Sequence, residues 1–226
     1  MRVTWLGQAG LLFKSSALTV LIDPYFSDSV GRIDPAKKRR IPVDPSLWQI
    51  QPDVLIFTHD HLDHFDPETA EHFLRSSRPM TVLAPNSVWQ KARQYGGPHN
   101  FVLFESGTQW TQGDIRFTAV PAAHSDPDAI GVLLQAENKL HYVTGDTLYS
   151  TRILSALPGG IDSVFLPVNG VGNNMNMVDA ARFVKDSKAT LAVPIHVGMM
   201  DELDPNDFPC DRKKILEVYK ETEIAL

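Results

Sequence analysis

Short apolar runs recur along the chain, separated by polar stretches and by turns that contain glycine or proline. Runs of this length that are rich in β-branched and aromatic residues are typical of buried strands. In chain order, the pattern predicts strands at Val3–Leu6, Gly10–Phe13, Leu18–Ile22, Val54–Phe57, Thr81–Ala84, Phe101–Phe104, Ile115–Ala119, Val132–Gln135, His141–Thr144 and Val164–Val168.

Helices are expected between and after these strands. Pro67 favours the first position of one helix, and Gly96-Gly97 ends another. Asn176 can cap a helix in the last third of the chain, with Asp179 near its positive N-terminal end. The predicted helices are Pro67–Arg75, Ser87–Gln94, Leu148–Leu157, Val178–Ser187 and Lys213–Thr222.

Strand clusters interleaved with a few helices indicate an α/β protein with two sheets and helices outside them. A length of 226 residues suits one large domain, so a single domain over residues 1–226 is expected. The one shift in composition is Arg32–Pro45, which combines prolines with the basic run Lys37–Arg40. Because prolines block regular pairing and four like charges need water, this stretch is expected to be an exposed loop.

Composition narrows the class of protein. Apolar residues make up 43% and charged residues 21% of the chain, which excludes wholesale disorder. No apolar run approaches the roughly 20 residues of a membrane-spanning helix, and the start lacks the features of a signal peptide. Cys210 is the single cysteine, which excludes disulfides and cysteine-rich zinc sites. A cytoplasmic location is therefore expected, and a net charge of −6 argues against nonspecific binding of nucleic acid or membranes.

The densest chemical signal follows the predicted strand Val54–Phe57 and contains His59, His61, Asp63 and His64. Residues two apart on an extended chain point to the same side, so His59 and His61 can chelate one ion. Asp63 and His64 fall in the next turn, where they can face a neighbouring ion. The alternative is a polar surface loop that happens to be rich in histidine. A metal site is favoured because three imidazoles at one strand end would repel one another when protonated.

Further ligands follow later strands. His124, Asp146 and His196 each come directly after an apolar run and before a turn, and strand ends can converge on one edge of the sheets. Each of these residues alone would be an ordinary turn or helix-start residue. The remaining histidines are interpreted as surface or packing residues, as are three of the tryptophans: His72, His99, His141, Trp48, Trp89 and Trp110.

These residues resemble the H-x-H-x-D-H motif and the later ligands of the metallo-β-lactamase superfamily, in matching order from about residue 1 to 200. The resemblance implies an αββα sandwich of two mostly antiparallel sheets flanked by helices, with the site at one edge. It implies one metal on the first two histidines of the motif plus a third, and a second metal on the remaining motif residues plus the last histidine. The implied sets are His59, His61 and His124; Asp63, His64 and His196; and Asp146 as the bridge.

Other segments resemble the branch that contains the ascorbate-6-phosphate lactonases. They are Trp5–Gly10, Leu21–Pro24, Thr144–Thr147 and Pro167–Gly170. That branch suggests manganese, whereas the wider superfamily mostly uses zinc.

The candidate ligands offer only nitrogen and oxygen, which suits Zn²⁺ or Mn²⁺, with Fe²⁺ less favoured. Two divalent ions, Asp63, Asp146 and a bridging hydroxide would leave about one positive charge, which favours a small anionic substrate. The expected function is therefore hydrolysis of a lactone, ester or phosphoester by a metal-bound hydroxide, with Asp63 and Asp146 as catalytic residues.

Three features have two interpretations each. Asp23 is either a turn former or a carboxylate that orients a ligand histidine. Asn169 lies in a glycine- and asparagine-rich loop and either forms a turn or binds substrate. Lys37–Arg40 could contact a substrate anion, but a solvated loop is favoured.

The alternatives to a small-molecule hydrolase are a nuclease or phosphodiesterase acting on nucleic acid, a non-catalytic metal-binding scaffold and an iron-dependent redox protein. A nuclease needs a basic track, against which the net charge of −6 and the single short basic run count. The oligomeric state is left open, with a homo-oligomer among the options.

Overall fold

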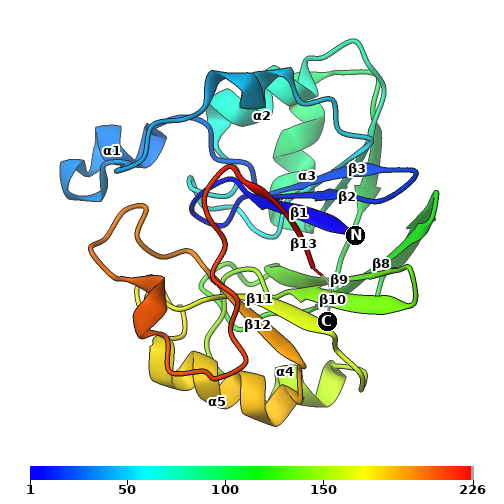
Figure 1. Cartoon of the computed structure of the whole chain (residues 1–226). Helices are drawn as coiled ribbons and strands as arrows, with labels where there is room; N and C mark the ends of the chain where they lie inside the picture. Colours follow the sequence, from blue (N-terminus) through cyan, green and yellow to red (C-terminus); the bar gives the residue numbers. More distant parts are fainter. Residues whose placement is uncertain (225–226) are drawn as a thin grey trace.

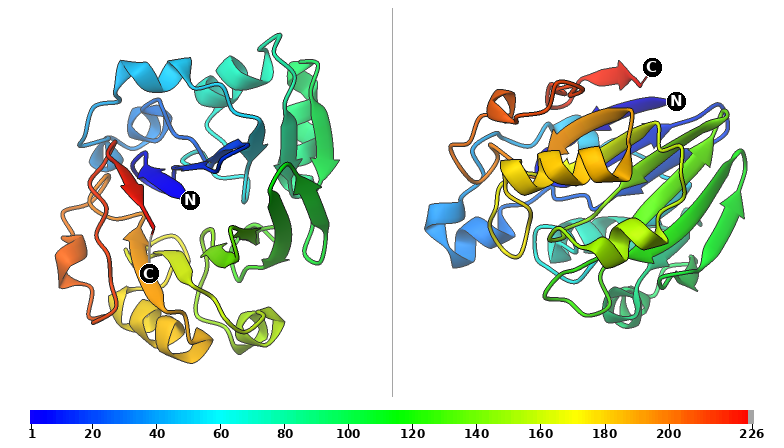
Figure 2. Two further views of the ribbon diagram at one scale, coloured as in Figure 1. Left: turned by 45° about the vertical axis from the view of Figure 1, so that its right-hand side comes forward. Right: turned by 90° about the horizontal axis from the view of Figure 1, so that it is seen from below.

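The computed structural model describes residues 1–224 and has two β-sheets packed face to face with helices on both outer sides (Figure 1). Over these residues, the first sheet has seven strands in the order β13-β1-β2-β3-β4-β5-β6, and the second has six in the order β12-β11-β10-β9-β8-β7. This is the αββα sandwich that the resemblance implies, and the two views of Figure 2 show the same layers.

The strands match the predicted runs closely, with β7, β12 and β13 in addition. The first sheet contains β1 (Arg2–Trp5), β2 (Leu11–Lys14), β3 (Thr19–Ile22), β4 (Val54–Ile56), β5 (Thr81–Ala84), β6 (Asn100–Leu103) and β13 (Glu221–Glu223). The second contains β7 (Gln109–Gln112), β8 (Ile115–Pro121), β9 (Ile130–Ala136), β10 (Lys139–Val143), β11 (Ser163–Pro167) and β12 (Leu191–Ile195).

Both sheets are mixed, which corrects the expectation of mostly antiparallel sheets. Strands β1 to β3 pair antiparallel through short connections, whereas β3 to β6 are parallel. In the second sheet β7 to β10 are antiparallel, and β10, β11 and β12 are parallel. The parallel halves arise where a helix lies between consecutive strands, because a crossover through a helix returns the chain in the same direction.

The longer helices cover the outer faces of the sheets. Figure 1 shows α2 and α3 on the first sheet and α4 and α5 on the second. Asn176 caps α5 by accepting a hydrogen bond from the amide of Asp179 at 2.9 Å, as predicted. None of the helices among residues 1–224 combines the length and apolar character that crossing a membrane requires. The helices are α1 (Ser29–Ile33), α2 (Pro67–Leu74), α3 (Asn86–Ala92), α4 (Thr151–Ala156) and α5 (Met177–Ser187).

Strand β4 shows why its predicted run is apolar without alternation. Val54 and Ile56 face the core between the sheets, while Leu55 and the following Phe57 belong to the core beneath α2 and α3. Successive strand residues point to opposite faces, and here both faces are covered. Strand β4 is therefore held rigidly by packing on both faces. The motif that begins at His59 directly follows this fully buried segment.

The predicted helix Lys213–Thr222 is wrong, because this segment is extended. Lys214 donates its amide to the carbonyl of Ala192 in β12 at 2.8 Å, and Tyr219 donates to the carbonyl of Trp5 in β1 at 2.8 Å. The segment then forms β13 beside β1. The edge strands of both sheets present free backbone groups, and pairing with them overrides local helix propensity.

The basic stretch is only partly the solvated loop that was expected. Lys37, Lys38 and Arg40 are exposed, but Arg39 is half buried. The Arg39 guanidinium donates to the carbonyls of Tyr25 at 2.6 Å and Ile41 at 2.8 Å, and to the hydroxyl of Tyr219 at 2.8 Å. These oxygens take the place of water, so one charge of the run serves to hold the loop against the body of the protein.

Candidate metal centre

The candidate ligands meet at one edge of the sandwich because each follows the end of a strand. The motif of His59 to His64 follows β4, His124 follows β8, Asp146 follows β10 and His196 follows β12 directly. The carboxyl ends of neighbouring parallel strands lie at the same edge of a sheet, which is where α/β proteins usually place their sites. The fold thus brings together residues up to 137 positions apart in sequence.

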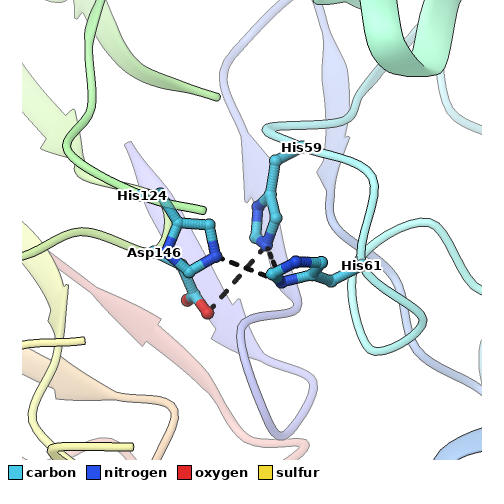
Figure 3. Close-up of side chains that lie close together, drawn as sticks. All are labelled: His59, His61, His124 and Asp146. Carbon is cyan, nitrogen blue, oxygen red and sulfur yellow. Dashed lines mark hydrogen bonds and ion pairs between the residues drawn. The ribbon is translucent and has the colours of Figure 1, made fainter. Parts of the chain in front are cut away.

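Three histidines, which we call the histidine group, converge with Asp146 in Figure 3. The Nε2 atom of His59 lies 3.1 Å from Nδ1 of His61, and Nε2 of His124 lies 3.1 Å from the same Nδ1. One ligand atom from each of the four residues lies within 4.8 Å of the others. Such a convergence of nitrogen lone pairs is the arrangement that a divalent cation needs.

Asp63, His64 and His196, which we call the carboxylate group, form a second convergence within 4.8 Å. Nε2 of His196 lies 3.1 Å from Oδ2 of Asp63. Asp146 also reaches this group, since its Oδ1 lies 3.3 Å from Nε2 of His64 and its Oδ2 lies 3.3 Å from Nε2 of His196. Asp146 therefore faces both groups.

An unpartnered atom shows that these residues fit a metal. Nε2 of His64 is buried and makes no hydrogen bond of good geometry among residues 1–224, although Oδ1 of Asp146 lies 3.3 Å away. Buried polar atoms almost always have a partner, so an ion at this position would satisfy the nitrogen. The donors are nitrogen and oxygen without thiolate, which matches Zn²⁺, Mn²⁺ or Fe²⁺.

Asp23 lies beside His64 and forms, with His59 and His64, a third set of ligand atoms within 4.8 Å of one another. Its Oδ2 is 2.8 Å from Nδ1 of His64, and its Oδ1 accepts a hydrogen bond from the amide of Thr58 at 2.8 Å. The carboxylate is 1% exposed. An acceptor at Nδ1 keeps the proton on that nitrogen and leaves Nε2 free to bind a cation. The contact is compatible with the interpretation of Asp23 as an orienting carboxylate, which stays a prediction.

In the histidine group, the second nitrogen of each ring has a weaker contact than the Asp23 carboxylate makes with His64. Nδ1 of His59 lies 3.0 Å from the hydroxyl of Thr58. Nε2 of His61 lies 3.3 Å from the hydroxyl of Ser125, and Nδ1 of His124 lies 3.3 Å from the carbonyl of Asn173. Neutral oxygens rather than a carboxylate thus orient these three rings.

Two amide side chains that the sequence analysis did not single out anchor the carboxylates. Gln8 Nε2 donates to Oδ2 of Asp63 at 2.7 Å. Asn174 Nδ2 donates to Oδ2 of Asp146 at 2.8 Å, and its Oδ1 accepts from the amide of Thr147 at 2.9 Å. Gln8 lies in a segment quoted for the family resemblance, and Asn174 lies in the asparagine-rich loop. Their membership in these segments is the signal that the sequence carries for either residue.

Asn169 contacts His196 rather than forming only a turn. Its Nδ2 lies 3.1 Å from Nδ1 of His196, and its buried Oδ1 has no partner in the described part of the chain. The backbone nearby is left-handed at His196 (φ 56°), Asp23 (φ 44°) and Gln8 (φ 48°). Such φ values in residues other than glycine store strain and cluster at functional sites.

Burial and like charge lower the pKa values of two members of the histidine group, His59 and His124. Burial, followed by the charge of His64, holds the pKa of His59 well below its usual value. Burial also lowers the pKa of His124, against the opposing pull of Asp146. Both rings are therefore neutral at pH 7, which is the form that binds metals.

The carboxylate group has the opposite electrostatics. Burial opposes charge on His196, but Asp146 and Asp63 outweigh it and raise the pKa of His196 to about 10. Asp146, Asp63 and Asp23 likewise raise the pKa of His64 well above its usual value. Burial alone would raise the pKa of both Asp63 and Asp146, but the two imidazoles lower it instead. Without metal, this group consists of imidazolium–carboxylate pairs.

We call the histidine group, the carboxylate group and Asp146 together the cluster. A cavity of about 390 Å³ lies over it. Its volume is at the lower end of the range for small-molecule sites. The three histidines interpreted as packing residues lie elsewhere: His72 and His99 contact main-chain carbonyls, and His141 contacts Ser163. The cavity is lined by Gln8, Val30, Lys37, His61, Asp63, Asp146, Asn169, Val171, Gly172, Asn174, His196, Met200 and Asp201.

Comparisons with known proteins identify the family to which the chain belongs. The model of a family described as "Beta-lactamase superfamily domain" matches residues 19–197. A UPF0173 protein of Pyrococcus furiosus is 26% identical over 95% of this chain and 91% of its own length. A UPF0173 metal-dependent hydrolase of Staphylococcus saprophyticus is 29% identical over 92% of this chain and 91% of its own length. The crystal structure of an isothiocyanate hydrolase from Delia radicum gut bacteria is 18% identical, covers 99% of both chains and has a TM-score of 0.78.

Proposed function

Because the chain belongs to the beta-lactamase superfamily, we propose that it is a metal-dependent hydrolase with a binuclear centre. The observation that carries the proposal is the division of seven candidate ligands into two groups that share Asp146. His59, His61 and His124 would hold one divalent ion; Asp63, His64 and His196 would hold the other. Zn²⁺ or Mn²⁺ suits these donors, with Fe²⁺ less favoured.

Two divalent ions, when bound, supply polarisation of the substrate oxygen and acidify water to a pKa of about 7. The chain's own groups then set the geometry. Gln8 holds Oδ2 of Asp63 at the cavity wall, where this oxygen would take up a proton from water during hydrolysis. Asn174 fixes Asp146 between the two groups, and Asp23 fixes the ring of His64. Such contacts hold the reacting groups in position, which supplies a large part of the rate enhancement of many enzymes.

The proposed substrate is a small anion with a lactone, ester or phosphoester bond, as in a lactonase-like enzyme. Two divalent ions bring four positive charges against the two carboxylates of Asp63 and Asp146, so the centre attracts negative charge. The cavity volume suits a metabolite. Among described residues, Lys37 is the single lysine or arginine in its lining, which disfavours a nucleic-acid backbone as substrate. A homo-oligomer and a cytoplasmic location stay predictions.

The test combines metal content with turnover. Protein purified without added metal is stripped by a chelator and reloaded with Zn²⁺ or Mn²⁺, and metal per chain is measured by elemental analysis. We expect two ions per chain, hydrolysis of lactones or esters by the loaded protein, and none by the stripped protein. His72→Gln, outside the cluster, should bind two ions as the parent does. Turnover that survives complete metal removal would refute the proposal, as would saturation at one ion per chain.

A further inference from the structure

The cavity over the metal centre has a second, chemically different part. Besides the cluster and its amides, its lining contains the apolar side chains of Val30, Val171 and Met200, and the charged side chains of Lys37 and Asp201. These come from the α1 region, the loop after β11 and the loop after β12. Figure 1 shows α1 on the same side of the molecule as the orange loop that follows β12.

Lys37 has little competition for its charge. Its nearest carboxylate is that of Asp34 at 3.8 Å, and both side chains are about half exposed. Ion pairs this long and this exposed contribute little. Asp201 also lines the cavity, but its Oδ1 accepts hydrogen bonds from the amides of Gly198 at 2.7 Å and Leu203 at 3.0 Å. Two amide dipoles thus already compensate the Asp201 carboxylate.

The other cations of the basic run differ from Lys37. Arg39 donates to main-chain carbonyls, among them that of Tyr25 at 2.6 Å. Arg40 pairs with Glu202 at 3.1 Å. Lys38 is exposed and does not line the cavity. Lys37 is therefore the member of the run that both reaches the cavity and keeps its charge available.

The backbone around Lys37 is held in place. Asp34 caps the short 3₁₀ helix Pro35–Lys37 by accepting a hydrogen bond from the amide of Ala36 at 3.1 Å. The amide of Arg39 donates to Asp28 at 2.9 Å, and the amide of Arg40 donates to the carbonyl of Met199 at 2.9 Å. The ammonium group therefore extends from a fixed backbone, which reduces the entropy lost when it binds a ligand.

We propose that Lys37 binds a second anionic group of the substrate, at the end opposite the bond that is cleaved. A carboxylate or a phosphate would suit a compact ammonium charge. Val30 and Val171 then pack against a short apolar stem that joins this anion to the reacting end. The substrates of this cavity are thus small molecules with an anionic group at the far end, an inference that rests on the proposed hydrolase function.

The first test measures binding to the metal-loaded protein by calorimetry and needs no turnover. Glutarate, with an anion at each end, is compared with butyrate, which lacks the second one. We expect glutarate to bind about tenfold tighter, the usual gain from a hydrogen bond to a charged group. The preference should vanish in Lys37→Met, return in Lys37→Arg, and persist in Lys38→Met as the matched control. Phosphonopropionate in place of glutarate tells whether a phosphate-like group is preferred over a carboxylate.

The second test measures hydrolysis of mono-para-nitrophenyl glutarate and of para-nitrophenyl valerate by the same proteins. We expect the ratio of their kcat/KM values to fall about tenfold in Lys37→Met, through KM for the anionic ester. If the loaded protein cleaves neither ester, the proposed function fails for esters, while the calorimetric preference still decides the role of Lys37. A glutarate preference that is absent from the parent, or unchanged in Lys37→Met, overturns the assignment.

Discussion

The two halves of the cluster meet at Asp146 but differ in charge. In the histidine group, burial lowers the pKa values of His59 and His124, and the charge of Asp146 only partly offsets it. The carboxylate group surrounds its histidines with Asp23, Asp63 and Asp146, and the pKa values of its histidines are raised. One half is thus ready for metal at neutral pH, whereas the other must first lose protons. The same residue type serves two roles because its neighbours differ.

Removal of the shared carboxylate should have the largest effect, since it damages both halves at once. We expect Asp146→Asn to bind fewer than one ion per chain and its rate of hydrolysis to fall more than about 100-fold. Loss of a residue that only orients a metal ligand usually has a smaller effect. Elemental analysis and steady-state rates measure this. Asp186→Asn, on the surface of α5, is the control. Two ions retained in Asp146→Asn would show that the halves are independent.

The difference in charge between the two groups predicts that the folding stability of the metal-free protein depends on pH. His196 has a folded pKa of about 10, above the unfolded value of 6.5, so the stability it contributes is fully present below pH 6.5. That stability is lost as the pH rises from 6.5 to 10. We expect the Tm of the metal-free protein to fall over this range and His196→Gln to flatten the decrease. A Tm independent of pH in the metal-free parent would contradict the assignment of charge.

The number of protons released on metal binding should also differ between the two groups. Filling the carboxylate group must displace the protons of His64 and His196, so calorimetry in buffers of different ionisation enthalpy should detect their release at pH 7. Metal binding by His59 and His124 should release almost no protons, because the pKa values of both rings are lowered. Two binding steps with equal proton release would remove the distinction between the halves.

Residues that orient the ligand histidines should affect metal affinity more in the carboxylate group than in the histidine group. Asp23→Asn replaces a charged acceptor at Nδ1 of His64, and a loss of about 10–100-fold in metal affinity is expected at that half. Competition with a fluorescent chelator measures the affinity. Asp53→Asn is a matched control, because that carboxylate pairs with Arg78 away from the cluster. Equal losses in both variants would mean that the effect is on folding.

The smallest effect is expected for Ser125→Ala. The Ser125 hydroxyl lies 3.3 Å from Nε2 of His61, a long contact between neutral groups. We expect a loss of less than about 1 kcal/mol, or about fivefold in affinity of the histidine group. A loss as large as that of Asp23→Asn would show that outer contacts act alike in both halves.

Much of this site could be predicted from local order along the chain. His59 to His64 lie within six residues after a buried strand, and a dense run of ligand types is visible without a structure. His124, Asp146 and His196 can be proposed as ligands from the sequence because each follows an apolar run and precedes a turn. The mixed character of the sheets was missed, since strand direction depends on the crossovers and leaves no pattern in the apolar runs.

The apolar runs and the residues at their ends were enough to indicate two layers of strands and candidate metal ligands, because each run and the residue that follows it are neighbours in the chain. Tertiary structure alone decided that Gln8 and Asn174 hold the carboxylates, that Lys37 reaches the cavity and that the segment from Lys213 is extended. Those outcomes depend on pairing between distant segments, such as Tyr219 with Trp5, and local periodicity carries no record of such partners.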